Sequence, residues 1–515
     1  MKKYFFIPVL LFIFSCKHYN RNQSNWQISS SSIENGELLA KKYCQGCHSF
    51  PEPSLLDVNS WETGVLPHMG PRLGILNFNF VQYPSIHMNR DVPQEYYPAK
   101  PLLTPEEWQD LMNFYIATAP DSMPPQHRPF PIINDLSIFE ISSPPKTGSN
   151  PTTCFLHVDT SRLPHSILQG DISGKSLVRF DQSLEPVDSI HWTGPVIDID
   201  FNKGSFIITN IGQLNPNNAK LGKLGTVILN ENGKMMLDTT ININSLQRPV
   251  QSIRFDLNGD GLPDELICEF GNLTGALSWY ENMNNNHYNR HVLRPVPGAI
   301  KAYVMDYNQD GLPDLFVLFA QGEEGIFLFT NRGHGQFDEK EILRFPPVYG
   351  SSYFEMDDFN QDGYPDILYT CGDNADFSKV LKPYHGVNIY LNDKHWNFTQ
   401  KYFFPIDGCY KAMARDFDGD GDLDLAVISF FPDFSKQPEE GFVYLENTGD
   451  FIFKPHSIAA AQHGRWLTMD VGDLDGDGKP DIVLGNFSVN PEFIKSTIPL
   501  KTAPSFLYLK NVARE

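Results

Sequence analysis

The sequence is poor in basic residues, in cysteine and in long apolar runs, and each shortage excludes a class of protein. Its 515 residues include 40 Lys and Arg against 62 Asp and Glu, a formal net charge of -22. Such a chain would repel the phosphates of nucleic acid, which argues against nucleic-acid binding. Seven cysteines over this length are too few for a disulfide scaffold. Ser-His-Asp, P-loop and dinucleotide-binding signatures are also missing.

The N-terminus has the pattern of an export signal. Lys2 and Lys3 precede an apolar run from Phe5 to Phe14, which is too short for an ordinary transmembrane helix. The run ends in the letters IFSC, which resemble a bacterial lipobox, so we expect residues 1–16 to be the signal, with lipidation at Cys16. Cleavage without a lipid is the alternative. These residues predict a bacterial envelope protein, held to the membrane by its lipid alone, on the periplasmic face or the cell surface.

An acidic motif recurs five times in the second half of the chain. Each copy follows the pattern D-x-[DN]-x-D-G-x-x-D, and successive starts are 50, 52, 58 and 57 residues apart. Side-chain oxygens at positions 1, 3, 5 and 9 and a backbone carbonyl at position 7 can surround a hard cation, while glycine at position 6 permits the sharp turn. One copy alone could be a solvated turn, but five copies predict calcium loops, with up to five Ca²⁺. The predicted ligands are Asp256, Asn258, Asp260, Leu262 and Asp264; Asp306, Asn308, Asp310, Leu312 and Asp314; Asp358, Asn360, Asp362, Tyr364 and Asp366; Asp416, Asp418, Asp420, Asp422 and Asp424; and Asp473, Asp475, Asp477, Lys479 and Asp481.

Position 12 of each motif separates these loops from EF-hands. An EF-hand has a bidentate glutamate there, whereas this chain has Ile267, Val317, Tyr369, Val427 and Leu484. The residues after each motif, such as DLFVLF, are β-branched and aromatic and predict a strand instead of a helix. A period of 50 to 58 residues with several short strands is typical of a propeller blade.

These motifs resemble the FG-GAP/VCBS repeats of integrin-like β-propellers, and the resemblance covers residues 151–515. Upstream, the stretch from Gly194 to Asn210 resembles a sixth copy without cation ligands, and the stretch from His165 to Asp181 resembles a fragment of a seventh. The resemblance implies an all-β propeller of six or seven blades, and we favour seven.

The stretch YCQGCHSF contains a CxxCH motif made by Cys44, Cys47 and His48. A redox dithiol would need a thioredoxin-like βαβ context, and a zinc site would need a second ligand pair. The sequence supplies neither. A helical pattern over residues 37–43 precedes the motif, and a second helix is predicted downstream, where Thr104 begins a capping box.

Two helices around a CxxCH in an exported segment resemble a class I cytochrome c domain, here residues 34–122 after a tether of residues 17–33. The resemblance implies one covalent haem c, with thioethers from Cys44 and Cys47 and with His48 as the proximal iron ligand. For the sixth ligand we favour Met69, which lies between two prolines, over Met88, whose distance from His48 is the more usual one. His–Met ligation would raise the reduction potential and suit electron transfer. The whole chain resembles exported Bacteroidetes-type proteins that combine such a haem domain with VCBS repeats.

A proline- and serine-rich segment, residues 123–150, is predicted to be the linker between the two domains. The four cysteines beyond it leave two readings open, either buried thiols or one or two disulfide bridges. They are Cys154, Cys268, Cys371 and Cys409.

Basic residues gather just before the calcium loops, where the innermost strand of each blade is expected. Arg248, Lys301, Lys411 and Arg465 therefore predict a basic ring around the central channel, suited to an anionic or carbonyl-bearing ligand. The alternative is that these cations pair with neighbouring carboxylates or buried carbonyls. A polar insertion at residues 371–386 is predicted to cover one channel mouth.

Three functions are consistent with these patterns. The leading hypothesis is an envelope-tethered haem protein that exchanges electrons with a redox partner protein or a small-molecule donor. In it, the calcium-stabilised propeller serves as a docking or ligand-binding platform. The second is a periplasmic oxidoreductase whose propeller oxidises a small, sugar-like substrate and passes electrons to the haem. The third is a binding or adhesion module. The sequence alone leaves open whether the protein is an enzyme.

Overall fold

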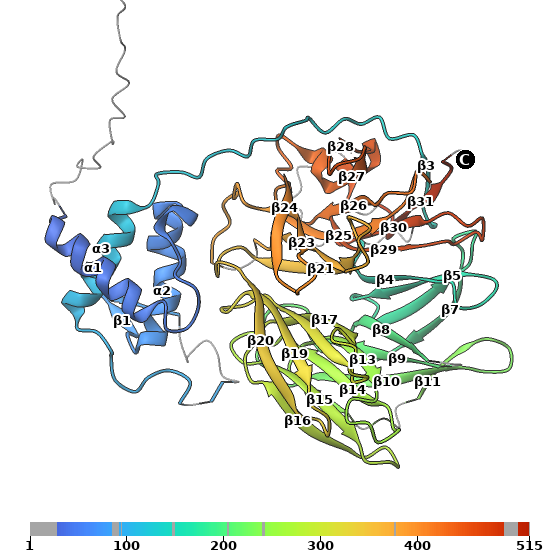
Figure 1. Cartoon of the computed structure of the whole chain (residues 1–515), viewed down its shortest axis with the longest axis horizontal. Coiled ribbons are helices and arrows are strands. Elements are labelled where there is room, and N and C mark those ends of the chain that lie inside the picture. The colour runs from blue at the N-terminus through green and yellow to red at the C-terminus, as the bar shows by residue number, and fades with distance from the viewer. Residues whose placement is uncertain are drawn as a thin grey trace, which may run out of the picture.

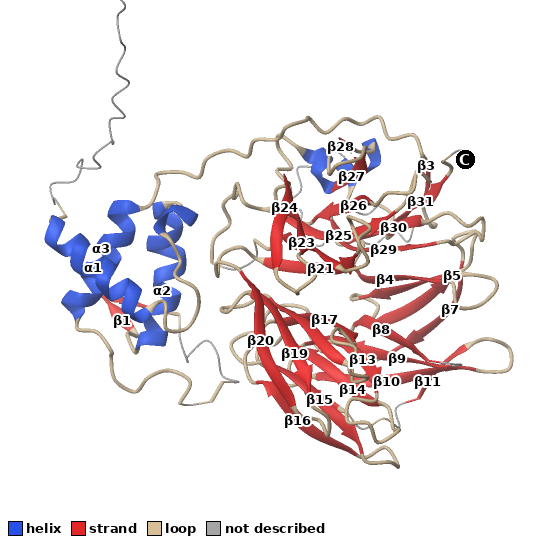
Figure 2. Cartoon of the chain, in the orientation of Figure 1, coloured by secondary structure: helices blue, strands red, loops and turns tan. Residues whose placement is uncertain are grey.

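The computed structural model describes residues 28–84, 92–93, 95–146, 150–202, 205–238, 241, 243–374, 377–488 and 503–513. β-strands are the main regular structure among these residues, and the few helices lie mainly near the N-terminus (Figure 2). None of the helices described is both long and apolar enough to cross a bilayer. The predicted lipidation site, Cys16, lies outside the described residues.

Seven antiparallel sheets surround a central axis, so the favoured prediction of a seven-bladed propeller is confirmed (Figure 1). Each blade starts with its innermost strand. The first three blades are β4 (Thr153–Asp159), β5 (Ser166–Asp171), β6 (Ser176–Phe180) and β7 (Pro186–His191); β8 (Val196–Asn202), β9 (Ser205–Asn210), β10 (Gly222–Leu229) and β11 (Met235–Asp238), with β12 (Asn244–Leu246) paired to β10; and β13 (Pro249–Phe255), β14 (Asp264–Glu269), β15 (Ala276–Asn282) and β16 (Tyr288–Arg294).

The fourth to seventh blades repeat this order along the chain. They are β17 (Ala299–Met305), β18 (Asp314–Phe319), β19 (Gly325–Asn331) and β20 (Phe337–Arg344); β21 (Ser351–Asp357), β22 (Asp366–Cys371), β23 (Gly386–Asn392) and β24 (Phe398–Pro405); β25 (Cys409–Arg415), β26 (Asp424–Ser429), β27 (Phe442–Asn447) and β28 (Phe453–His456); and β29 (Trp466–Gly472), β30 (Asp481–Asn486), β31 (Phe506–Asn511) and β3 (Phe139–Ser142).

The core lies between neighbouring blades. Every residue of the second strands β14, β18, β22, β26 and β30 is buried, because both faces of such a strand pack on adjacent sheets. This explains why runs such as DLFVLF are apolar without alternation. The outer strand β20 is mostly exposed.

The seventh blade takes its outermost strand, β3, from the segment of the chain that precedes the first blade. Phe139 to Ser142 form β3 and pair antiparallel with β31, with Phe139 opposite Asn511 and Ser142 opposite Tyr508. The propeller therefore includes Phe139–Ser142, which the sequence pattern assigns to the linker. This pairing joins the two ends of the propeller without a covalent bond.

The predicted linker is bound along the propeller. Ile133 forms a bridge with His456 at the edge of the sixth blade, and His456 Nδ1 lies 2.7 Å from the carboxylate of Asp135. Further upstream, Arg128 pairs with the fully buried Glu440 and donates from Nε to the carbonyl of Pro405 at 2.8 Å. We call residues 126–138 the strap.

The N-terminal helical segment, residues 28–120, packs around its own small core. It contains α1 (Ser30–Tyr43), a short helical stretch from Ser60 to Leu73 that includes α2 (Leu66–Met69), the hairpin strands β1 (Asn77–Phe78) and β2 (Val81–Gln82), and α3 (Pro105–Thr118). The predicted capping box is present, because Thr104 accepts from the Glu107 N–H while the Glu107 side chain accepts from the Thr104 N–H.

The helical segment is neither purely α-helical nor clearly separate from the propeller. It includes the β1–β2 hairpin, and its core is shared with Val348 and Val380 of the propeller. In Figure 1 this segment lies beside the blades that contain β20 and β24. The expected free-standing all-α domain is therefore not what the structure shows, because apolar side chains of the fifth blade and the loop before it complete its core.

Candidate functional site

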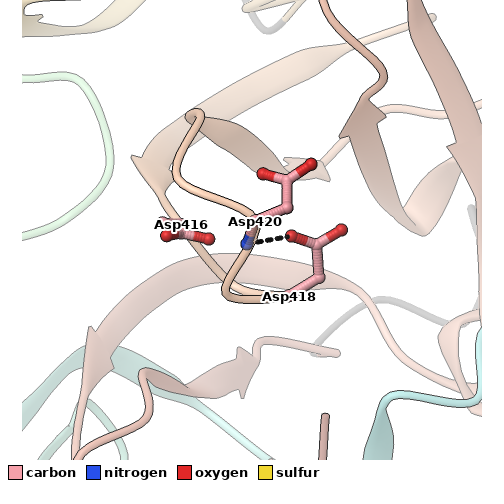
Figure 3. A group of neighbouring side chains, drawn as sticks. All are labelled: Asp416, Asp418 and Asp420. Carbon is pink, nitrogen blue, oxygen red and sulfur yellow. Dashed lines mark hydrogen bonds between the residues drawn. The ribbon is translucent and has the colours of Figure 1, made fainter. Parts of the chain in front are cut away.

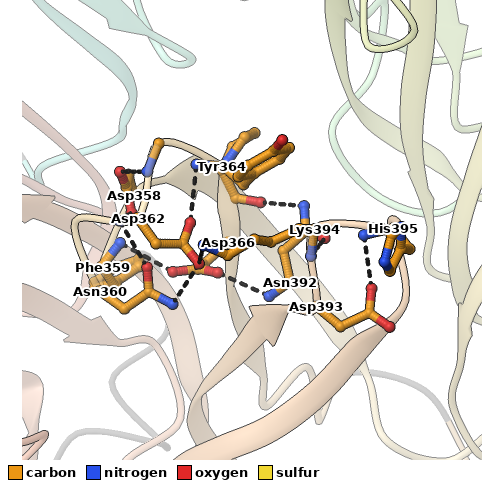
Figure 4. Close-up of polar contacts among 12 residues, drawn as sticks. Asp358, Phe359, Asn360, Asp362, Tyr364, Asp366, Asn392, Asp393, Lys394 and His395 are labelled. Carbon is orange, nitrogen blue, oxygen red and sulfur yellow. Dashed lines mark hydrogen bonds and ion pairs between the residues drawn. The ribbon is translucent and has the colours of Figure 1, made fainter.

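The five acidic motifs form turns between the first and second strands of the third to seventh blades. In every turn the position-1 aspartate accepts an N–H from the glycine at position 6. The position-3 oxygen accepts from the N–H of position 5. Figure 4 shows this arrangement around Asp358, Asn360 and Asp362. These bonds turn the position-1 and position-3 side chains toward the backbone N–H groups of the loop.

The carboxylates converge most closely in two of the turns. In the sixth blade one carboxylate oxygen from each of Asp416, Asp418 and Asp420 lies within 4.8 Å of the others (Figure 3). In the seventh blade, carboxylate oxygens of Asp473, Asp475 and Asp481 also lie within 4.8 Å of one another. Such oxygen clusters suit a hard divalent cation, and without one the like charges repel.

The position-9 aspartate of each motif, a predicted cation ligand, also accepts hydrogen bonds from backbone N–H groups inside its blade. All five are fully buried, and each accepts from the N–H of motif position 2 and from the N–H of an asparagine at the end of the third strand. In the sixth blade Asp424 accepts from Phe417 at 3.2 Å and from Asn447 at 2.8 Å. Burial raises the pKa of Asp424 to about 7. The asparagines are Asn282, Asn331, Asn392, Asn447 and Asn511.

Sequence reasoning missed these asparagines, although a signal was present. Each side-chain amide also donates to the carbonyl of motif position 8, as Asn392 does to Pro365 at 3.1 Å. An asparagine recurs in these five blades at intervals of 49, 61, 55 and 64 residues, each time as the last residue of an apolar run. It ties each loop to the third strand of its own blade.

The CxxCH motif directly follows α1. The N–H of Cys44 caps the helix by donating to Ala40 O at 2.9 Å, and Cys44 is half-buried while Cys47 is exposed. Both are free thiols in the described structure. Burial raises the pKa of the Cys44 thiol to about 11. The two cysteines therefore lie on one turn, at the boundary between core and surface.

His48 lies at the contact between the helical segment and the propeller. Its Nδ1 is 2.8 Å from Ser49 O, so Nδ1–H donates and Nε2 keeps its lone pair. Burial lowers the pKa of His48, and the guanidinium groups of Arg72 and of Arg344 in β20 lower it further. A neutral imidazole with a fixed tautomer is the form that binds a metal ion.

Of the two candidate sixth ligands, only Met69 is among the residues that the structure describes. Met69 ends α2 and is half-buried against the same core that Cys44 packs on. Met88 lies outside the described residues.

The helical segment contacts the propeller through hydrogen bonds and stacked rings. Ser49 Oγ donates to Phe345 O at 3.0 Å, and Tyr384 donates from its hydroxyl to Leu55 O at 2.8 Å. The rings of His68 and Phe377 stack with centroids 4.2 Å apart. Two cavities, of about 220 and 450 Å³, flank this stacked pair.

The four predicted channel cations do not form a single ring. Lys301 and Lys411 are the third residues of β17 and β25, and their ammonium groups lie 5.7 and 4.8 Å from the centroid of the Tyr353 ring. Arg248 and Arg465 precede β13 and β29 and so lie at a different level of the channel.

Three of these cations donate to backbone carbonyls, which is one of the two kinds of partner named in the alternative prediction. Lys411 Nζ donates to Met469 O at 2.7 Å, Arg465 Nε to Phe430 O at 2.9 Å, and Arg248 to the carbonyls of Gly271 and Leu214. Burial lowers the pKa of Lys411 to about 8.

Carboxylates in the channel join neighbouring blades, which sequence reasoning also missed. Asp470 in β29 accepts from the Val158 N–H of β4 at 2.9 Å and pairs with His157 at 3.0 Å. Burial disfavours the charged form of His157, but Asp470 outweighs it and raises the pKa of the imidazole. Glu355 accepts from the Ala414 N–H of the next blade at 2.9 Å. Polar residues at alternate positions of the innermost strands were the available signal.

The four remaining cysteines are buried free thiols in the described structure. Cys268, Cys371 and Cys409 belong to three different core clusters, and Cys154 lies against the carbonyls of Gly170 and Val196.

The repeats match the family model described as FG-GAP-like repeat, over residues 256–317, 306–369 and 416–484. These segments together contain all five acidic turns. The chain carries FG-GAP-like repeats. The T-cell immunomodulatory protein homolog of Plasmodium falciparum (isolate 3D7) is 26% identical over 246 residues, which cover 36% of this chain. The match spans only about a third (33%) of that relative's length.

Among solved structures, the periplasmic gluconolactonase of Pseudomonas aeruginosa aligns with a TM-score of 0.40 and 8% identity, covering 62% of this chain and 97% of that structure. A seven-bladed propeller with FG-GAP-like repeats is an architecture suited to a binding or docking platform.

Proposed function

We propose that this protein transfers electrons through one covalent haem c, held by the helical segment, and that the propeller is its calcium-stabilised docking or ligand-binding platform. The observation that carries this proposal is the CxxCH motif. It follows α1 with two free thiols and with a histidine whose Nε2 is left available.

The residues present fit the group. Cys44 and Cys47 would form the thioethers, and His48, whose Nδ1–H is fixed by Ser49 O, would bind the iron through Nε2. Met69, packed against the same core, is the sixth ligand we favour, with Met88 as the alternative. When bound, a haem with His–Met ligation supplies reversible one-electron chemistry at a raised potential.

The protein's own residues keep this site next to the propeller. Ser49 is hydrogen-bonded to Phe345, and Tyr384 is hydrogen-bonded to Leu55. These two bonds, both made by residues that follow the motif, act together with the shared core around Val348. A redox partner or donor docked on the fourth or fifth blade would therefore lie close to His48.

Calcium is assigned to the five acidic turns. The clustered oxygens in the sixth and seventh blades and the glycine bonds in all five turns favour it. Each bound ion would offset the repulsion among three or four carboxylates. An envelope location, with attachment by a lipid on Cys16, is part of the proposal because calcium is abundant outside the cytoplasm.

The test uses the full chain, exported in a host that attaches haem c, oxidised, and followed by haem absorption. We expect reversible reduction and reoxidation by small redox mediators at one electron per chain, with no reduction by sugars alone. A Cys47→Ser variant is the matched control. Reduction by a sugar alone would instead support the oxidoreductase alternative, and a protein that never cycles would overturn the proposal.

A further inference from the structure

Two lysines and a tyrosine meet at one level of the propeller channel. Lys301, Tyr353 and Lys411 are the third residues of the innermost strands β17, β21 and β25, which belong to three successive blades. In each strand a register shift comes just before this residue. The ammonium groups of Lys301 and Lys411 lie 5.7 and 4.8 Å from the centroid of the Tyr353 ring. Two positive charges therefore lie beside one aromatic ring.

These three side chains keep accessible surface inside the propeller. All three are half-buried, although each innermost strand packs between the innermost strands of the blades on either side of it. Figure 1 shows these strands around the central axis. The surface that the mid-strand side chains keep therefore faces the channel.

The two ammonium groups have more hydrogen-bond donors than the protein uses. Each carries three N–H donors. Lys411 donates to Met469 O at 2.7 Å, whereas Lys301 lies over the rings of Tyr303 and Tyr353. Among the described residues, no carboxylate lies within ion-pair distance of either group. Most of these donors are therefore open to a ligand with a negative charge.

Carboxylates face the same channel from other blades. Asp470 of β29 uses Oδ2 to accept from the Val158 N–H and to pair with His157, and no described residue donates to its Oδ1. Asp198, the third residue of β8, uses Oδ2 to accept from the Ser252 N–H at 2.9 Å. Burial raises the pKa of Asp198 to about 6, so it is ionised at neutral pH. The channel thus has cations on the fourth and sixth blades and carboxylates on the second and seventh.

We infer that this level of the channel binds a small zwitterion, a free neutral amino acid: Lys301 and Lys411 bind its carboxylate, and Asp470 and Asp198 bind its ammonium group. A ligand with both charges is complementary to both walls. A simple carboxylic acid or a simple amine would be attracted by one wall and repelled by the other. This inference rests on the propeller part of the proposed function, to which it gives a ligand class, and it does not depend on the haem.

The first experiment uses the wild-type full chain and titration calorimetry with each neutral standard amino acid. For the amino acid that binds most tightly, the matched probes are the same molecule without its amino group and the same molecule without its carboxylate. A hydrogen bond to a charged group contributes enough for each probe to bind about ten- to a hundredfold more weakly. An absence of binding by every neutral amino acid would overturn the inference. Haem content, measured by intact mass on the same samples, tests the haem separately.

The second experiment assigns each wall to one ligand group. Lys301→Met should reduce the advantage of the amino acid over the amine, and Lys301→Arg should retain it. Asp470→Asn, whose side-chain oxygen still accepts from Val158, should instead reduce the advantage over the acid that lacks the amino group. Lys454→Met is the control, because Lys454 is exposed in β28, and it should bind as the wild type does. A folded Lys301→Met variant with the ligand preferences of the wild type would overturn the inference, since a merely structural lysine would leave these ratios unchanged.

Discussion

Two substitutions in the acidic turn of the sixth blade should distinguish the stability that comes from buried hydrogen bonds from the stability that comes from a bound cation. Asp424 is fully buried and accepts from the N–H groups of Phe417 and Asn447 and from the hydroxyl of Tyr444 at 2.6 Å. A buried donor left without a partner costs about 1–3 kcal/mol. Asp424→Ala leaves three such donors, so it should lower the free energy of unfolding by roughly 3–6 kcal/mol after some relaxation.

Asp418 in the same turn makes a different contribution. Its carboxylate lies near those of Asp416 and Asp420, and the bond that it accepts from the Asp420 N–H, at 3.2 Å, is long and exposed. Asp418→Ala therefore mainly removes a cation ligand. When calcium is a hundredfold above its Kd, a bound ion contributes about 2.7 kcal/mol, and the variant should lose up to that amount.

The assay is thermal and chemical unfolding of the wild type and both variants, in excess calcium and in excess EDTA. EDTA should lower the melting temperature of the wild-type propeller by many degrees, while the covalent haem stays attached. Asp418→Ala should be destabilised in calcium and nearly equal to wild type in EDTA, whereas Asp424→Ala should be destabilised in both. Glu231→Gln, an exposed carboxylate in the β10–β11 turn, serves as the control.

Two results would refute this reasoning. A wild-type melting curve unmoved by EDTA, with no calcium in the purified protein, would show that the turns are only solvated. An Asp424→Ala variant as stable as wild type would show that the buried hydrogen bonds contribute nothing.

Further predictions concern the strap, the channel and the iron ligand. Glu440→Ala removes the carboxylate that pairs with the buried guanidinium of Arg128. It should lower the free energy of unfolding, measured in urea, by about 3–5 kcal/mol. An unchanged urea midpoint would mean that the strap does not stabilise the propeller. The raised pKa of His157 means that its stabilising effect is present below pH 6.5 and is lost as the pH rises through the higher, folded-state value. Between pH 6 and 9 the free energy of unfolding should therefore decrease less in His157→Phe than in wild type. Parallel curves for the two proteins would contradict the pairing of His157 with Asp470. Met69→Ala should replace the His–Met haem spectrum with that of a vacant or water-filled site, and Met88→Ala should not; the reverse pattern would assign the ligand to Met88.

The repeats of this protein were predictable because their signals are local. The acidic motif, the glycine at position 6 and the apolar run after it all lie within twelve residues, and each constrains the turn and strand that contain it. The capping box at Thr104 is equally local, and it forms as predicted. α1 begins at Ser30, before the predicted residues 37–43, because Ser29 caps it.

Contacts between distant segments were not predictable in the same way. The pairing of Phe139 with Asn511 and of Arg128 with Glu440 depends on where the chain returns after seven blades. No periodicity in the sequence encodes that return. The channel cations fall at two levels because Lys301 lies inside β17 whereas Arg248 precedes β13, and strand boundaries are harder to predict than the strands themselves.

The most direct test of the central claim is the intact mass of the full chain, exported in a host with the haem c attachment machinery and denatured before measurement. We predict a mass increase equal to one haem, which persists after acid and organic extraction and disappears in the Cys44→Ser, Cys47→Ser double variant. A chain at the unmodified mass, with both thiols open to alkylation while a control cytochrome c in the same cells is fully loaded, would contradict the account.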